Sequence, residues 1–76
     1  MMNLYIVIYI AGLVGGTVEA LPYDMEECQH RATAEMAKID PTITTPDGFS
    51  ARDVRFVCEW HDVRPENQPG AGVQHD

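Results

Sequence analysis

The clearest pattern in the chain is a set of apolar residues at helical spacing. They recur three or four positions apart, at Met25, Cys28, Ala32, Met36 and Ile39. This spacing places them on one face of a helix. Asp24 is a residue type preferred at a helix N-cap, and Asp40-Pro41 ends the pattern because a residue before proline avoids the helical conformation. The sequence therefore predicts a helix from Asp24 to Ile39 with a narrow apolar stripe that a sheet could pack against.

The run from Leu4 to Ala11 is uncharged and apolar, and it is rich in the Ile, Val and Tyr residues that favour strands. A strand here would place Leu4, Ile6, Ile8 and Ile10 on one face and Tyr5, Val7 and Tyr9 on the other. A strand that is apolar on both faces is normally central in its sheet. The stretch from Gly12 to Gly16 then predicts a turn, and the stretch from Thr17 to Leu21 predicts a second, shorter strand.

The same run also has the features of a secretory signal, and the sequence leaves both interpretations open. Val18-Glu19-Ala20 has the small-x-small form of a cleavage site, but residues 1–3 lack the Lys or Arg that usually opens a signal. A membrane anchor is disfavoured, since residues 4–18 as a helix would rise about 22 Å against a hydrocarbon core of roughly 30 Å. The strand interpretation implies a cytoplasmic protein, and the signal interpretation a periplasmic or secreted chain from Leu21.

The last regular pattern is a strict alternation from Val54 to Trp60. Val54, Phe56, Cys58 and Trp60 point one way, and Arg55, Val57 and Glu59 the other. Before it, residues 42–45 have extended propensity and Pro46-Asp47-Gly48 predicts a turn; a helix starting at Ser50 fits the pattern less well. Residues 62–76 contain two prolines and two glycines without periodicity, which predicts a disordered tail after a single domain of residues 1–61.

These elements predict a small α+β domain of order β-β-α-β. If the last strand inserts beside the first, the apolar strand is central in an antiparallel or mixed sheet, and the helix covers one face. The other face carries Tyr5, Val7 and Tyr9, with nothing obvious in the chain to cover it. Such a face is typical of a surface for a partner or for self-association. The alternative is that the 42–45 loop or the tail folds over it.

Two cysteines, Cys28 and Cys58, lie on the apolar stripe of the helix and on the apolar face of the last strand. Both patterns indicate that the two could meet across a helix–sheet interface. In an oxidising compartment they would form one disulfide, worth roughly 3–4 kcal/mol on the chain-entropy model. In a reducing cytosol they would be two small buried hydrophobic residues.

Charge and candidate chemistry point away from catalysis. The net charge of -7 disfavours direct contact with nucleic acid, and the acidic residues are scattered, although an acidic mimic of DNA remains an alternative. His30, His61 and His75 lack the spacing of metal ligands. A reactive Cys28 thiolate is less favoured than a structural disulfide. No phosphate-binding loop or nucleophile constellation is present. We therefore expect no enzyme activity, cofactor or metal.

Three segments carry a resemblance: Leu4 to Ile10, Met25-Glu26-Glu27-Cys28-Gln29 and Arg55-Phe56-Val57-Cys58. Their order resembles that of very small two-cysteine proteins of unknown function common in bacteriophage and bacterial genomes. The resemblance implies a small accessory protein without assigned activity. We expect a non-enzymatic protein that binds another protein; a secreted, disulfide-stapled peptide and an acidic DNA mimic are the alternatives.

Overall fold

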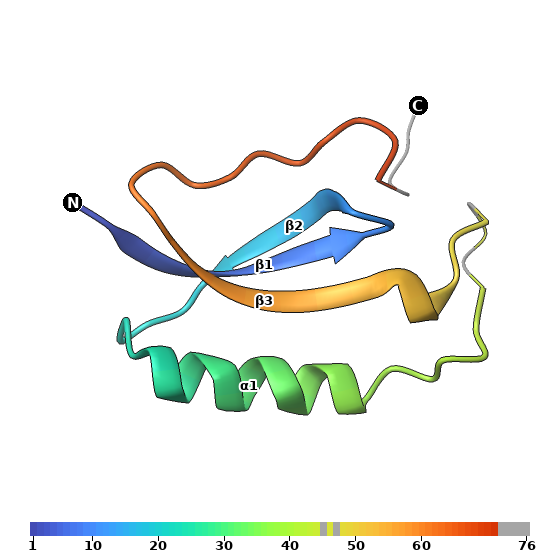
Figure 1. Cartoon of the computed structure of the whole chain (residues 1–76), viewed down its shortest axis with the longest axis horizontal. Coiled ribbons are helices and arrows are strands. Elements are labelled where there is room, and N and C mark those ends of the chain that lie inside the picture. Colours follow the sequence, from blue (N-terminus) through green and yellow to red (C-terminus); the bar gives the residue numbers. More distant parts are fainter. Residues whose placement is uncertain (45, 47, 72–76) are drawn as a thin grey trace.

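The computed structural model of the protein describes residues 1–44, 46 and 48–71. In chain order, its elements are β1 (Asn3–Ile10), β2 (Leu13–Glu19), α1 (Met25–Ala37), the short 3-10 helix η1 (Ala51–Asp53) and β3 (Val54–His61). The strands form one sheet of order β2-β1-β3, antiparallel throughout. α1 lies on one side of the sheet and residues 62–71 on the other (Figure 1). The predicted α+β class, element order and central β1 are confirmed.

β1 is central because it is apolar on both faces. Leu4 and Ile6 belong to the core beneath α1, while Tyr5 and Val7 alternate with them on the opposite face. All four side chains are buried, and Val7 is 0% exposed. Across the sheet, Ile6 pairs with Val18 of β2 and with Cys58 of β3. The hydrophobic alternation therefore fixes the register of both neighbouring strands, since a slip by one residue would exchange the two faces.

The β1–β2 hairpin turns earlier than the sequence analysis expects. Its two turn residues are Ala11 and Gly12, with positive φ values of 53° and 85°, and β2 begins at Leu13 rather than Thr17. Two-residue hairpin turns with positive φ match the twist of the flanking strands. Gly15 thus lies inside β2, next to a register shift between Ile8 and Tyr9. A Cβ at Gly15 would come within 2.6 Å of Ile10 Cδ1, so this glycine permits close packing rather than a turn.

The predicted helix is present and ends two residues early, at Ala37. The Asp24 carboxylate accepts hydrogen bonds from the backbone amides of Glu26 and Glu27, as expected of an N-cap. Cys28 and Ala32 of the predicted stripe are buried against the sheet. The core beneath α1 consists of Leu4, Ile6, Ala20 and Cys28, flanked by Tyr23, Met25, Phe56 and Cys58.

A disulfide joins α1 to β3. It links Cys28 to Cys58, whose Cα atoms are 6.2 Å apart. The expectation that the two cysteines meet across the helix–sheet interface is confirmed. Because the residues are 30 positions apart, the bond closes a loop that contains the whole connection between helix and strand.

The connection from α1 to β3 has little regular structure. Thr44 and Ser50 form a single antiparallel bridge, and Ser50 caps the short η1 helix by accepting a hydrogen bond from the Arg52 amide. The extended propensity of residues 42–45 thus gives no longer strand among the described residues. The predicted turn at Pro46-Asp47-Gly48 includes a position, Asp47, that lies outside the described residues.

The segment after β3 bears on two expectations, and for the face of Tyr5 and Val7 it agrees with the alternative that the tail folds over it. Residues 62–71 are not a disordered tail: they cross the sheet face opposite α1 (Figure 1), and the Gln68 amide donates to the Val14 carbonyl at 2.7 Å. The Arg64 guanidinium lies 5.6 Å from the centre of the Tyr5 ring. The face of Tyr5 and Val7 is therefore covered rather than open. Residues 72–76 lie outside the described residues.

Within the described residues, no helix has the length and apolar character needed to span a membrane.

Removing the disulfide should destabilise the fold. We expect the double variant Cys28→Ala/Cys58→Ala to lose about 3–4 kcal/mol of unfolding free energy, because the unfolded chain regains the freedom of a 30-residue loop. Urea titration followed by circular dichroism measures the loss. A reducing agent should lower the stability of the wild type by a similar amount and leave the variant unchanged. Equal stability of variant and wild type would contradict the prediction.

Removing residues 1–20 should abolish the fold. A chain that starts at Leu21 keeps α1, β3 and the disulfide but lacks the central strand with Leu4 and Ile6. We expect no cooperative thermal transition and poorly dispersed amide resonances, because most of the core beneath α1 is gone. A chain lacking only the exposed Met1 and Met2 is the control and should fold. A cooperative transition in the short chain would show that β1 is dispensable.

Candidate functional site

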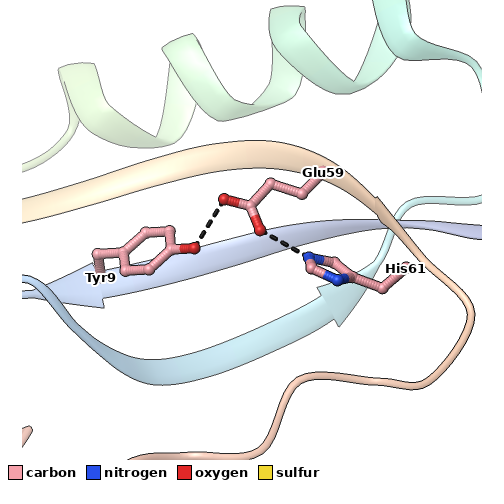
Figure 2. A network of polar contacts seen from close by, with 3 residues as sticks. All are labelled: Tyr9, Glu59 and His61. Atoms are coloured by element: carbon pink, nitrogen blue, oxygen red, sulfur yellow. Dashed lines mark hydrogen bonds and ion pairs between the residues drawn. The ribbon is translucent and has the colours of Figure 1, made fainter.

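A polar network lies on the sheet face opposite α1. The Tyr9 hydroxyl donates a hydrogen bond of 2.7 Å to one carboxylate oxygen of Glu59. The other oxygen of Glu59 lies 2.6 Å from Nε2 of His61 (Figure 2). Glu59 therefore joins a tyrosine of the central strand to a histidine at the end of β3.

Strand alternation brings these three side chains together. Glu59 and His61 are two positions apart on β3, so they share a face. In the β1–β3 register, Tyr9 pairs with Arg55, which is four positions from Glu59 and therefore on the same face of β3. Because directly paired residues lie on the same face, Tyr9 shares the face of Glu59. The Tyr9 side chain thus runs along the sheet to reach a residue four positions beyond its direct partner on β3. The network ties β1 to β3 by side chains in addition to their backbone hydrogen bonds.

The network shifts the pKa values of two of its members. The hydrogen bond to Glu59, together with partial burial and the nearby negative charge, raises the pKa of the Tyr9 hydroxyl. Partial burial by itself would raise the pKa of the Glu59 carboxyl. The hydrogen bonds from Tyr9 and His61 outweigh this effect, so the pKa of Glu59 lies below its ordinary value. The folded structure thus favours a neutral Tyr9 beside a charged Glu59.

The residues around the network close this face of the sheet. The Asn3 amide donates to the Tyr5 hydroxyl at 3.4 Å, and the rings of Tyr5 and His61 have centres 6.4 Å apart. Arg64 belongs to residues 62–71, which are called the covering segment below. Its guanidinium lies over the Tyr5 ring at a distance typical of a cation–π contact. In the part of the chain that the structure describes, no Ser, Thr, Cys or Lys side chain bonds to the network. The arrangement holds β1, β3 and residues 62–71 together.

The predicted site residues lie in three different environments. Cys28 and Cys58 are joined on the α1 side of the sheet. Tyr5 and Val7 are buried under residues 62–71, so they do not form the accessible binding face that we expected. Tyr9 is half-buried and bound to Glu59. The alternation of β3 predicts that Glu59 lies on the face opposite Cys58, but the contact between Glu59 and Tyr9 depends on the β1–β3 register, which local patterns do not give.

The histidines do not converge. His30 is exposed on α1, His61 is bound to Glu59, and His75 lies outside the described residues. Among residues 1–44, 46 and 48–71, no cluster of three or more His, Cys, Asp or Glu side chains could hold a metal ion.

The accessible feature of the sheet is the outer edge of β3. β3 is the last strand of the order β2-β1-β3, and no described segment pairs with its outer side. Val57 and Trp60, on opposite faces of β3, are 40% and 41% exposed. A groove of about 480 Å³ runs between this strand and α1, and Met36, Phe56 and Val57 are among its lining residues. A strand edge and a partly apolar groove therefore lie side by side.

Comparisons of the chain with protein-family models, with curated proteins and with solved structures give no match. The function of the β3 edge and of the polar network has to be argued from their own geometry.

Breaking the network should lower stability in a pH-dependent way. We expect Glu59→Gln to cost about 1 kcal/mol of unfolding free energy at pH 7, since the bonds to Tyr9 and His61 lose a charged acceptor. Because the pKa of Glu59 is lower in the folded than in the unfolded chain, its contribution is present above the unfolded value of about 4.3. It is lost as pH falls through the folded pKa, so the difference between the two proteins should shrink in acid.

Urea titrations of the wild type and the variant between pH 7 and pH 3 measure this difference. Glu35→Gln, at an exposed position on α1, removes the same charge outside the network and is the control. A difference that is constant with pH, or equal for both variants, would show that the bonds to Glu59 do not stabilise the fold.

Proposed function

We propose that the protein is a small accessory protein without enzymatic activity, and that it acts by binding a partner protein that adds a strand to β3. The observation that carries this proposal is the outer edge of β3, with which no described segment pairs. β3 is an eight-residue strand with two partly exposed apolar side chains, Val57 and Trp60. An exposed strand edge presents a row of backbone donors and acceptors that an extended segment of another chain can satisfy.

The two edges of the sheet differ in their contacts with the covering segment. On β2, the Val14 amide donates to the Gln68 side chain and the Val14 carbonyl accepts from the Gln68 amide, both at 2.7 Å. Residues of the covering segment thus occupy part of that edge. β3 has no such contact with a described segment on its outer side. Natural sheets usually protect their edges, so the asymmetry favours β3 as the surface that is paired in the functional state.

The groove beside α1 adds a means of selecting the partner. In strand addition, backbone hydrogen bonds supply affinity and alternate side chains of the added strand enter pockets. A strand paired with β3 would direct every second side chain toward the groove between β3 and α1. The groove offers the apolar surface of Met36 and Phe56 beside the polar groups of Gln29 and Thr33. We infer a partner strand whose residues on that side are mainly apolar.

Site-specific photo-crosslinking in the producing cells tests this proposal. A photo-reactive amino acid at Trp60 should give a discrete crosslinked product, which mass spectrometry identifies. Val57→Lys in the same chain should abolish the product, since an edge lysine opposes strand addition. Val18→Lys is the matched control: Val18 is 47% exposed and lies on β2, away from the β3 edge, so the product should persist.

Both lysine variants should retain the circular dichroism spectrum and cooperative unfolding of the wild type. A crosslinked product that survives Val57→Lys would show that the contact at Trp60 does not involve strand addition to β3. Loss of the product in the Val18→Lys protein as well would point to a general effect of added charge.

A further inference from the structure

We propose that the strand paired with β3 is β3 of a second copy of this chain. This inference rests on the proposed function, because it names the occupant of the same edge. Two identical edges related by a two-fold axis perpendicular to the sheet pair in antiparallel fashion. The result would be a continuous six-stranded sheet of order β2-β1-β3-β3-β1-β2, with the axis passing through Val57.

The charges of β3 select this register. With the axis at Val57, Arg55 of each copy stands directly opposite Glu59 of the other, and all four side chains lie on the same face of the joined sheet. Asp53, just before the strand, comes opposite His61. The opposite charges of Arg55 and Glu59, directly across an antiparallel pair, stabilise it, and the symmetry gives this pair twice.

Neighbouring registers lose this complementarity. An axis at Phe56 would bring Asp53 opposite Glu59, and an axis at Cys58 would bring Arg55 opposite His61. Axes at Arg55 or Glu59 would place like charges on the axis itself. Residues directly opposite each other on paired strands have their side chains on the same side of the sheet. The two-fold axis must therefore pass through a residue position and not between two residues. Within β3, the axis at Val57 is therefore the one that joins Arg55 to Glu59.

The apolar residues of the edge agree with the same axis. Val57 would meet its own copy on the face that carries the polar network, and Val54 would lie opposite Trp60 on the α1 side. Pairs of a β-branched with an aromatic or a β-branched residue are favourable across strands. Both Val57 and Trp60, which are exposed in the single chain, would lose exposed surface.

The groups that would form the new contacts are accessible. Arg55 is exposed, and within the described residues its guanidinium donates to the carbonyls of Arg52 and Val54 nearby in its own chain. Each carboxylate oxygen of Glu59 accepts one hydrogen bond and retains capacity for another. The groove between β3 and α1 leaves space along the edge, and the two copies of α1 would lie antiparallel there. Gln29, Thr33 and Met36, spaced four and three residues apart, line that side of α1.

The test uses the purified full chain and its self-association, measured by sedimentation equilibrium over a range of protein concentrations. We expect a monomer–dimer equilibrium for the wild type. Arg55→Glu places two carboxylates opposite each other twice per dimer and should weaken dimerisation at least about tenfold. Lys38→Glu makes the same change in charge at the exposed end of α1 and should leave the dimerisation constant unchanged. Each variant is checked for wild-type cooperative unfolding.

A cysteine at the axis tests the register directly. Mild oxidation of Val57→Cys should give a covalent dimer, because the two thiols meet only if the axis passes through this position. Val63→Cys, at an exposed position beyond β3, is the control and should stay monomeric under the same conditions. A dimer that is insensitive to Arg55→Glu, or a covalent dimer formed equally well through residue 63, would overturn the proposed pairing.

The two proposals fail in different ways. A chain that stays monomeric at every concentration, while its Trp60 crosslink in cells to another protein is lost with Val57→Lys, overturns self-pairing and keeps strand addition to β3. A monomeric chain without any crosslink that depends on Val57 overturns both. A dimer that Arg55→Glu weakens and Lys38→Glu does not supports both.

Discussion

Burial of both faces of β1 is the requirement on which the rest of the structure depends. Leu4 and Ile6 need cover on one side, and Tyr5 and Val7 need it on the other. Fully burying a large apolar side chain is worth about 1.5–3 kcal/mol, so a fold that covered only one face would lose a substantial part of a small stability. Among the described residues, α1 is the one α-helix that serves this purpose. The second layer is therefore an irregular segment, residues 62–71, held by Gln68 and Arg64.

The disulfide and the polar network act on opposite sides of β3. Cys58 ties the strand to α1, and Glu59, one residue further, ties it to Tyr9 of β1. β3 is thus anchored on both faces of the sheet, while no described segment pairs with its outer side. A strand held in this way is preorganised for pairing, since little backbone freedom would be lost when a second strand is added.

Much of the fold could be predicted from the sequence, because it depends on local patterns. The stripe of α1, the Asp24 cap, the alternation of β3 and the double-faced β1 are visible without any long-range information. They predict a central β1 on the condition that β3 pairs beside it, which the structure shows. The misses depend on contacts between distant residues. The sequence predicts a turn at Gly15, although this glycine makes room for Ile10 within a strand. Residues 62–71 have no periodicity, so nothing local indicates that Gln68 pairs with Val14. The Tyr9–Glu59 bond requires the register of strands far apart in sequence.

The covering segment also determines when the protein can complete its fold during synthesis. The β1–β2 hairpin is local and leaves the ribosome first, but the other neighbour of β1, β3, begins only at Val54. The second face of β1 stays exposed until residues 62–71 have emerged. For most of translation the growing chain therefore presents Tyr5 and Val7 to the cell, as an apolar hairpin that other chains or chaperones can reach. Such a protein is expected to complete its fold only after residues 62–71 have emerged, with a rate set by long-range pairing rather than by its helix.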